Sequence, residues 1–402
     1  MAAGLKNIKL IEELELKNKN VFIRVDFNVP MNDGTITDDN RIQAALPTIK
    51  FAMDQGAKVI LASHLGRPKD GVFEKKYSLE PVARHLGGLL NCDVMLIEDP
   101  SGEAPKGLLA GLKSNQILLL ENVRFEAGET KNSHELALHW AEYTDVYIND
   151  AFGSSHRAHA SMVALPELIS QKGVGFLVKR ELEALSQLLN TPKKPFFAVL
   201  GGAKVSDKIG VIENLADLVD GFVVGGAMAY TFLSAKGIRV GKSLVEKDQM
   251  KYASELMSRL EARNKKFILP VDHVVVQSLS EVTQHRVTSG PAIDDGWLGV
   301  DIGPKSSELF SAELRAAKTV FWNGPMGIFE TSQFAHGTFS VAKAISQIDG
   351  VTIVGGGDSA SAAKESGCAD KMTHISTGGG ASLEYLQGDL LPGIEVLRIR
   401  VR

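Results

Sequence analysis

Apolar and polar residues alternate along residues 21–30, VFIRVDFNVP. Because successive side chains of a β-strand point to opposite faces, the apolar residues share one face, and Arg24, Asp26 and Asn28 share the other. The first face is predicted to be core, and the strand is predicted to stop at Pro30. The polar face has two interpretations from this stretch alone. It is either the exposed side of an edge strand with a local ion pair, or part of a binding site in which Arg24 orients Asp26.

Short apolar runs alternate with segments of helical periodicity through the first half of the chain. Apolar residues recur at helical spacing after Arg41 and stop at Gly56, which predicts a helix that begins near Arg41. Ser133 is predicted to cap a later helix. Buried strands are expected over residues 58–63, 93–97, 117–120 and 145–148. This alternation predicts an α/β fold with a doubly wound, mostly parallel sheet and helices on both faces.

The second half repeats the alternation, and here the predicted strands run into glycine clusters. The four clusters are Gly201-Gly202, Gly225-Gly226, Gly355-Gly356-Gly357 and Gly378-Gly379-Gly380. Glycine lets the backbone approach a ligand closely, and the N–H groups at a helix start favour phosphate. Lys204 and Lys208 follow the first cluster and share a helix face if that helix begins near Val205. One cluster is usually a turn, but four in equivalent places favour a nucleotide site.

The length of 402 residues exceeds the roughly 250 to 300 at which a single core stops growing, so two domains are expected. Residues 175–190 carry the apolar stripe of one helix and are followed by a Pro-Lys-Lys-Pro turn, a combination typical of a domain connector. We therefore expect an N-terminal domain over 1–174, a connecting hinge helix over 175–190, a C-terminal nucleotide-binding domain over 191–385 and a tail over 386–402.

Composition narrows the classes of function. The 44 Lys and Arg against 48 Asp and Glu give a net charge of -4, which argues against a dedicated nucleic-acid binder. No apolar run approaches the ~18 residues that a membrane helix needs. Cys92 and Cys368 are too few for a disulfide framework or a zinc site. The first residues lack the apolar region of a signal peptide, so a cytoplasmic protein without a membrane partner is expected.

Charged side chains of the first half follow the predicted strands. His64 and Arg67 follow one strand, Arg124 and Arg157 follow two others, and Arg41 lies at a helix start. In a parallel sheet, ligands bind beyond the carboxyl ends of the strands. A surface salt bridge is the better explanation of any one of these arginines alone. All of them, however, follow a predicted strand or lie at a helix start, and guanidinium is the preferred partner of phosphate and carboxylate. A pocket for a small polyanion is therefore favoured.

Several other motifs are weaker signals of function. Residues 237–243, GIRVGKS, resemble a P-loop but have three residues between the glycines instead of four. No G-x-G-x-x-G segment follows a strand and opens a helix, which argues against a nicotinamide oxidoreductase. His156 and His159 lack the further ligands of a zinc site. Asp358 is the better metal candidate, because Mg²⁺ bound through phosphates needs only one or two protein oxygens.

Taken as a whole, the sequence resembles the phosphoglycerate kinase family. Eight segments carry the resemblance, in the family's order: VFIRVDFNVP, SHLGRP, LLENVRF, NDAFGSSHRAH, LGGAKVSDK, WNGPMGIFE, VGGGDSA and HISTGGGASLEYL. The resemblance implies reversible transfer of the γ-phosphoryl of ATP to the carboxylate of 3-phosphoglycerate, with Mg²⁺ as cofactor. It also implies a monomer, a tail that returns to the N-terminal domain, and hinge positions near Glu181 and His374. A non-catalytic nucleotide-binding protein of the same fold is the remaining alternative.

The same resemblance assigns the site residues. The acceptor is bound by residues of the first half: Asp26, Phe27, Asn28, Arg41, His64, Leu65, Gly66, Arg67, Arg124 and Arg157. The nucleotide is bound by residues of the second half: Gly202, Lys204, Lys208, Gly225, Gly226, Asn323, Pro325, Glu330, Gly356, Gly357, Asp358 and Ser359. The transferring phosphoryl meets Arg41, Lys204, Gly357 and Gly380, and Asp358 holds the metal. Departures from the family pattern are Ser359 in place of threonine, and Gln387 and Asp389 near the tail.

Overall fold

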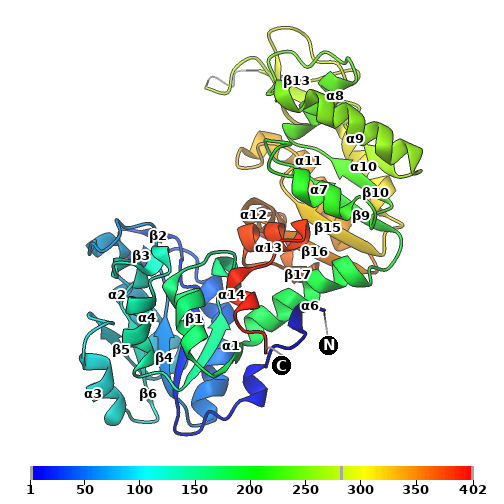
Figure 1. Ribbon diagram of the computed structural model, residues 1–402. Helices are drawn as coiled ribbons and strands as arrows, with labels where there is room; N and C mark the ends of the chain where they lie inside the picture. Colours follow the sequence, from blue (N-terminus) through cyan, green and yellow to red (C-terminus); the bar gives the residue numbers. More distant parts are fainter. Residues whose placement is uncertain (1–2, 281–283, 400–402) are drawn as a thin grey trace. The chain divides into compact units, whose positions relative to one another are not determined.

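The computed structural model describes residues 3–280 and 284–399, which divide into two compact units (Figure 1). Unit 1 comprises the chain up to Glu183 together with the segment from Leu390 onward, and unit 2 comprises Ala184–Asp389. Each unit contains one six-stranded parallel sheet with helices, which confirms the predicted α/β fold class.

The sheet of unit 1 has the strand order β5-β6-β4-β1-β7-β8, and all neighbours are parallel. Its strands are β1 (Asn20–Val25), β4 (Lys58–Ala62), β5 (Asp93–Ile97), β6 (Gln116–Leu120), β7 (Val146–Asp150) and β8 (Gln171–Val174). A small hairpin pairs β2 (Met31–Asn32) with β3 (Thr35–Ile36). The helices are α1 (Asn40–Asp54), α2 (Glu80–Leu90), α3 (Ala104–Ala110), α4 (His134–Ala141), α5 (Leu165–Leu168) and, near the C-terminus, α14 (Pro392–Glu395).

Helices cover both faces of this sheet. Val21, Ile23 and Val25 of β1 pack in one cluster with apolar residues of α1 and α2. On the opposite face, Phe22 packs against Trp140 of α4 and Tyr147 of β7, with ring centroids 6.2 and 6.0 Å away. Ser133 Oγ accepts a hydrogen bond from the Leu136 N–H, which confirms the predicted cap of α4.

Strand β1 lies in the middle of the sheet, between β4 and β7, so its interpretation as an edge strand with an exposed face is wrong. Arg24 is fully buried. The strand also ends at Val25 instead of reaching Pro30. The next residues leave the ladder because the Phe27 N–H donates to Ser63 Oγ, at 2.8 Å, and the Val29 N–H donates to the Phe27 carbonyl.

Unit 2 has the strand order β11-β10-β9-β15-β16-β17, again with all neighbours parallel. Its strands are β9 (Phe196–Leu200), β10 (Gly221–Val224), β11 (Lys266–Ile268), β15 (Thr319–Asn323), β16 (Val351–Gly355) and β17 (His374–Ile375). A separate antiparallel sheet, not predicted, joins β12 (His273–Val276), β13 (His285–Val287) and β14 (Leu298–Ile302). The helices are α7 (Ile209–Leu215), α8 (Met228–Ala235), α9 (Met250–Ala262), α10 (Pro304–Leu314), α11 (His336–Ser346), α12 (Gly357–Glu365) and α13 (Gly379–Gln387).

Helix α7 begins at Ile209, later than the expected start near Val205. Lys204 therefore lies on the turn before the helix, and the prediction that Lys204 and Lys208 share a helix face is wrong. The turn is held by Glu246, whose carboxylate accepts hydrogen bonds from the Ser206 N–H and hydroxyl.

Helix α6 (Phe176–Asn190) begins at the end of unit 1, where side chains bind its first N–H groups. The Phe176 N–H donates to Thr48 Oγ1 at 2.9 Å, and the Leu177 and Val178 N–H groups donate to Asp150 Oδ1 at 2.9 and 3.3 Å. Asp150 is fully buried, and its second oxygen has no hydrogen-bond partner among the described residues. Burial raises the pKa of this carboxyl group to about 7, although the helix N–H groups favour the charged form.

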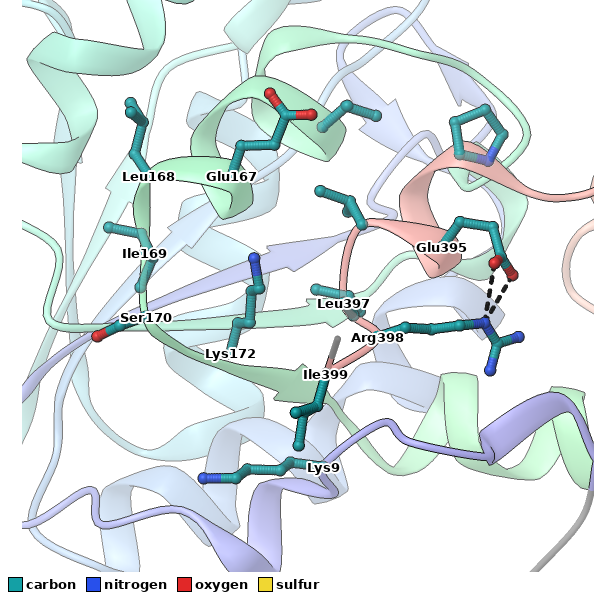
Figure 2. A pocket seen from close by; sticks show the side chains of 13 residues that line it. Lys9, Glu167, Leu168, Ile169, Ser170, Lys172, Glu395, Leu397, Arg398 and Ile399 are labelled. Atoms are coloured by element: carbon teal, nitrogen blue, oxygen red, sulfur yellow. Dashed lines mark hydrogen bonds and ion pairs between the residues drawn. The ribbon is translucent and has the colours of Figure 1, made fainter. Parts of the chain in front are cut away.

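The C-terminal segment packs on the rest of unit 1. The Gly393 N–H donates to the Ser155 carbonyl, and Asn149 Nδ2 donates to the Gly393 carbonyl, each at 2.9 Å. A pocket of about 910 Å³ is lined in part by this segment. Figure 2 shows its lining side chains, among them Lys9, Lys172 and the Glu395–Arg398 ion pair. Over the described ranges, no helix is both long enough and apolar enough to span a bilayer.

The raised pKa of Asp150 predicts a pH effect on stability. Between the pKa of an unfolded aspartate, about 4, and the folded value of about 7, the carboxyl group takes up a proton on folding, so its contribution to stability falls as pH rises. Asp150→Asn keeps the accepting oxygen but does not titrate. Its free energy of unfolding relative to wild type should therefore increase by about 1.4 kcal/mol per pH unit between about pH 4 and 7 and then stay constant.

Urea unfolding at a series of pH values measures this difference. Asp145→Asn is the matched control. Asp145 is exposed, lies next to β7, the strand that contains Asp150, and also accepts a hydrogen bond from a backbone N–H, that of Asn20. A difference for Asp150→Asn that does not change with pH would contradict the titration assigned to Asp150.

Candidate active site

The predicted acceptor residues of unit 1 meet at the carboxyl end of its sheet. Asp26 follows β1, and its two carboxylate oxygens accept hydrogen bonds from Nη1 of Arg41, in the first turn of α1, at 3.0 and 2.9 Å. Asn28 Oδ1 accepts a hydrogen bond from the Gly66 N–H at 2.8 Å. The loop after β1 is thereby fixed both to α1 and to the loop after β4.

Arg124 joins these loops from β6. Its Nη1 donates to the Gly66 carbonyl at 2.5 Å, and its backbone N–H donates to Asn122 Oδ1 at 3.1 Å. Burial, together with repulsion from Arg157 and Arg24, lowers the pKa of Arg124 to about 10, so the group stays charged at neutral pH. Its Nε is buried and has no hydrogen-bond partner among the described residues, which leaves a donor available to a ligand.

His64 is the buried centre of this group of cations. Burial lowers its pKa well below the usual range, and the positive charges of Arg24, Arg124, Arg157 and Arg41 lower it further. His64 is therefore neutral at pH 7. Arg157 donates from Nε to His156 Nε2 at 3.1 Å, and burial together with the Arg157 charge lowers the pKa of His156 as well.

We call Arg24, Arg41, Arg67, Arg124 and Arg157 the arginine cluster. Each arginine acts on the pKa of His64 or of Arg124, so the structure brings together charges from strand β1, the start of α1 and the three loops after β4, β6 and β7. The positive charges of these neighbouring arginines repel one another, and an anion with two or more negative charges relieves that repulsion. The arrangement of charges is thus that of a site for a polyanion.

Two predicted acceptor residues have another role. Phe27 and Leu65 are buried in the core of unit 1, so only their backbone groups are near the arginine cluster. The Leu65 carbonyl accepts a hydrogen bond from Asn122 Nδ2 at 2.7 Å. Among the functional neighbours that the sequence did not reveal, Asn122 holds both Leu65 and the backbone of Arg124.

In unit 2, the loops after β9, β10 and β15 interlock through their backbones. The Gly202 N–H donates to the Pro325 carbonyl and the Gly226 N–H to the Met326 carbonyl, each at 3.0 Å. Gly226 has a φ of 66°, and a Cβ atom added to it would lie 2.5 Å from the Gly202 nitrogen. Glycine is therefore required here by both conformation and space.

The loops after β16 and β17 bring two helix N-termini together. Gly356 has a φ of 95°, and a Cβ added to Gly379 would lie 3.0 Å from Gly356 Cα. Gly357 and Gly380, in the first turns of α12 and α13, are exposed. Ser359 Oγ accepts from the Gly324 N–H at 2.6 Å, which ties α12 to the loop after β15. Two adjacent helix starts with exposed N–H groups form a phosphate-binding arrangement.

The two lysines differ in their surroundings. Lys204 is exposed on its turn. Lys208 Nζ donates to Asn323 Oδ1 at the end of β15, and burial lowers the pKa of Lys208 while Asp207 and Asp358 oppose the change. Asn323 also donates from Nδ2 to the Gly355 carbonyl at 2.6 Å. The sequence did not point to Glu246, which holds the turn between the lysines from 40 residues away.

A pocket of about 360 Å³ opens beside these loops. Five of the predicted nucleotide residues line it: Gly202, Gly226, Pro325, Glu330 and Asp358. The remaining lining is largely apolar and was not predicted from the sequence. Its larger side chains are Tyr230, Leu244, Leu279, Leu298, Val300, Met326 and Ile328. Leu244 and Leu279 are half exposed at its edge. A small apolar pocket with a carboxylate at its rim suits a planar base and its sugar.

Metal binding in unit 2 would depend on Asp358. Within residues 3–280 and 284–399, no three His, Cys, Asp or Glu side chains are grouped to hold a metal ion. Asp358 is exposed in the first turn of α12, beside the exposed backbone of Gly357. One carboxylate beside a phosphate site fits Mg²⁺, which keeps several waters and binds mainly through phosphate oxygens. The donor set therefore fits magnesium bound together with a nucleotide.

Comparison with known proteins identifies the family of this chain. A sequence model of phosphoglycerate kinases matches residues 11–389. The chain is 61% identical to the phosphoglycerate kinase of Bdellovibrio bacteriovorus over 402 residues, all of both chains. The chain belongs to the phosphoglycerate kinase family. It is also 52% identical over 392 residues to the phosphoglycerate kinase of an Anaeromyxobacter species, with 97% of this chain and 99% of the relative covered.

Solved phosphoglycerate kinases have the same fold. The enzyme of Coxiella burnetii matches with a TM-score of 0.89 and 43% identity over 98% of this chain and 100% of that chain. The enzyme of Pyrococcus horikoshii matches with a TM-score of 0.84 and 34% identity over 96% and 98%. Membership of the phosphoglycerate kinase family makes the chain a phosphotransferase with a carboxyl group as acceptor, and excludes the oxidoreductase and non-catalytic alternatives.

The interlocked glycine loops predict the effect of a single methyl group. Gly226→Ala should weaken nucleotide binding about tenfold or more, because the added Cβ pushes the loops after β9 and β15 apart. Calorimetric titration with ADP measures the effect. Gly237→Ala is the matched control, since Gly237 has a similar φ of 78° but open space around the added atom. Equal affinities in the two variants would contradict the role assigned to the loop contact at Gly226.

Proposed function

We propose that this phosphoglycerate kinase transfers the γ-phosphoryl of ATP reversibly to the carboxylate of 3-phosphoglycerate, with the acceptor bound in unit 1 and the nucleotide in unit 2. The observation that carries the proposal is the arginine cluster around His64 at one sheet end. Two negative groups, a phosphate and a carboxylate, match its charge. The glycine loops and the apolar pocket of unit 2 support the nucleotide assignment.

The acceptor residues divide into two groups. Asp26 and Asn28 receive the hydroxyl and carboxylate end of glycerate, and the Asp26 ion pair places Arg41 beside that end. His64, Arg67, Arg124 and Arg157 surround the phosphate, for which Arg124 Nε is an available donor. Backbone groups of Phe27, Leu65 and Gly66 complete this side.

The nucleotide residues also divide by the part of the ligand that they bind. The apolar pocket takes the adenine, Glu330 at its rim takes the ribose, and Lys208 with the N–H groups of Gly356, Gly357 and Ser359 takes the phosphates. Asp358 would hold Mg²⁺, which when bound neutralises phosphate charge. Gly202, Gly225 and Gly226 shape the loops, and Asn323 and Pro325 fix them from β15.

The chemistry needs no general base. A carboxylate oxygen of the acceptor is already ionised at pH 7 and attacks the γ-phosphorus, while the bond from that phosphorus to the β–γ bridging oxygen breaks and ADP leaves. Arg41, Lys204 and the N–H groups of Gly357 and Gly380 face the oxygens on which charge develops. Preorganised donors of this kind lower the barrier more than any covalent participation of the protein.

In-line transfer requires the reacting atoms to come within about 3 to 3.5 Å of each other. Because the acceptor and donor groups belong to different units, the proposal includes a hinge over α6 and near Glu181 and His374. We also assign the domain limits 1–174, 175–190 and 191–385, with 386–402 as a tail on the N-terminal domain. A cytoplasmic monomer completes the proposal.

A coupled assay tests the function directly. Purified protein with ATP, MgCl₂ and 3-phosphoglycerate should form ADP and 1,3-bisphosphoglycerate, which glyceraldehyde-3-phosphate dehydrogenase reports through NADH oxidation. Removal of magnesium with EDTA should abolish the signal, and MgCl₂ should restore it. Protein that binds ADP but forms no acyl phosphate would refute the proposed reaction.

Arg41 and Lys204 are assigned to the transferring phosphoryl, so their removal should affect turnover. Loss of one transition-state donor costs about 3 kcal/mol, which predicts a fall in kcat of about a hundredfold for Arg41→Ala and for Lys204→Ala. Steady-state kinetics gives kcat, and circular dichroism checks the fold. The matched controls are Arg84→Ala and Lys251→Ala, exposed cations that pair within their own helices. A variant with near-normal kcat would remove that residue from the catalytic set.

A further inference from the structure

A chain of fully buried polar side chains lies behind His64, and the proposed reaction does not use it. Glu129 accepts hydrogen bonds from the Ser161 N–H, at 2.8 Å to Oε2, and from the Ser161 hydroxyl, at 2.6 Å to Oε1. Ser161 Oγ accepts from Arg24 Nε at 2.9 Å. Arg24 Nη2 lies 3.2 Å from His64 Nδ1. Glu129, Ser161 and Arg24 have no exposed surface.

The members of this chain come from distant parts of the sequence. Glu129 begins the 3-10 turn Glu129–Lys131 after β6, and Arg24 belongs to the central strand β1. Ser161 lies in a π-helical turn, Ala160–Ala164, of a kind that is rare and occurs frequently at functional sites. This turn presents both the N–H and the hydroxyl of Ser161 to one carboxylate.

The hydrogen-bonding capacities of the groups decide the tautomer of His64. Guanidinium has donors and no acceptor, so Arg24 Nη2 can only donate to His64 Nδ1. His64 Nδ1 must therefore be unprotonated. Since a neutral imidazole carries one proton, that proton is on Nε2. The depressed pKa of His64, which burial and the surrounding arginines cause, agrees with a neutral ring.

A neutral donor has a specific use among so many cations. The arginines surround His64 with positive charge, and protonated histidine would add to their repulsion. A ring with hydrogen on Nε2 instead offers a hydrogen bond at fixed direction without another charge. The opposite tautomer would present a lone pair and repel a phosphate oxygen.

We propose that Glu129 is a positioning residue which, through Ser161 and Arg24, holds His64 as the neutral Nε2–H tautomer that donates to the phosphate of the acceptor. The proposal rests on the proposed function for the identity of that acceptor. Glu129 itself touches no substrate. A second side chain, His159, also lies near Glu129, with its Nδ1 3.7 Å from Oε1. Burial is the main cause that lowers the pKa of His159 to about 3. The ring is therefore neutral and does not neutralise the charge of Glu129.

Glu129→Gln tests the chain with a side chain of the same shape. The amide NH₂ donates where a carboxylate oxygen accepted, so one of the two Ser161 bonds is lost and Ser161 holds Arg24 less firmly. Nitrogen NMR of ¹⁵N-histidine-labelled protein should show His64 only as Nε2–H in wild type and a mixture with Nδ1–H in the variant. The His64→Gln spectrum assigns the signal. The dissociation constant of 3-phosphoglycerate, from calorimetry, and its KM should rise about tenfold, while kcat and the KM of ATP stay unchanged.

Two further variants make the result decisive. Ser161→Ala breaks the chain at its middle and should change the tautomer and the affinity in the same direction, with a double variant no worse than either single one. Glu126→Gln is the matched control, because Glu126 lies in the same loop but binds Ser101, and it should leave both readouts at wild-type values.

The possible outcomes separate this inference from the proposed function. His64 with hydrogen on Nδ1 in wild type would overturn the inference, as would folded Glu129→Gln and Ser161→Ala proteins that keep the wild-type tautomer or the wild-type affinity for 3-phosphoglycerate. Wild-type protein that binds 3-phosphoglycerate without transferring phosphoryl to it would refute the reaction instead, and the NMR and calorimetry would still decide the role of Glu129.

Discussion

A guanidinium buried in the centre of a parallel sheet requires a matched partner, and much of unit 1 is arranged around this requirement. Removing such a charge from water costs several kcal/mol unless it is paired and hydrogen-bonded. Arg24 meets this condition through Ser161, which connects it to Glu129, and through the Val25 carbonyl, which accepts a hydrogen bond from Arg24 Nη1. The loops that supply these two partners are the loops that carry Arg124 and Arg157. Pairing of Arg24 therefore also brings the other arginines to the end of the sheet.

The site proposed for the nucleotide phosphates in unit 2 uses a different physical means. Its loops offer backbone N–H groups at two adjacent helix starts, and they pack so closely that Gly226 and Gly379 leave no space for a side chain. Backbone dipoles stay in place when a phosphoryl group departs, whereas a cluster of guanidinium groups binds a permanent polyanion more strongly. Under the proposed function, the helix starts of unit 2 suit the phosphates whose charge changes during transfer, and the arginine cluster of unit 1 suits the acceptor phosphate, which does not react.

The sequence predicted those elements whose burial is decided locally. The strand Asp93–Ile97 has the predicted bounds, and α6 begins one residue after the predicted start, because continuous apolar runs and helical stripes need no distant partner. The end of β1 at Val25 was missed because it depends on Ser63, a residue of another strand end. The start of α7 at Ile209 was missed because Glu246 holds the preceding turn. Short strands of the antiparallel sheet gave no comparable signal.

The same distinction explains which site residues could be found. Arg124 and Asp358 directly follow strands or glycine clusters, so the rule for parallel sheets and the family resemblance both pointed to them. Glu129 lies eight residues beyond Glu121 in an irregular loop, and its partner Ser161 is 32 residues further on, within a turn whose π geometry has no sequence signature. A residue that acts by fixing the tautomer of another residue belongs to no sequence motif with a regular spacing. It becomes visible only when each donor in the chain is matched to an acceptor, because Arg24 can satisfy His64 in one protonation state and in no other.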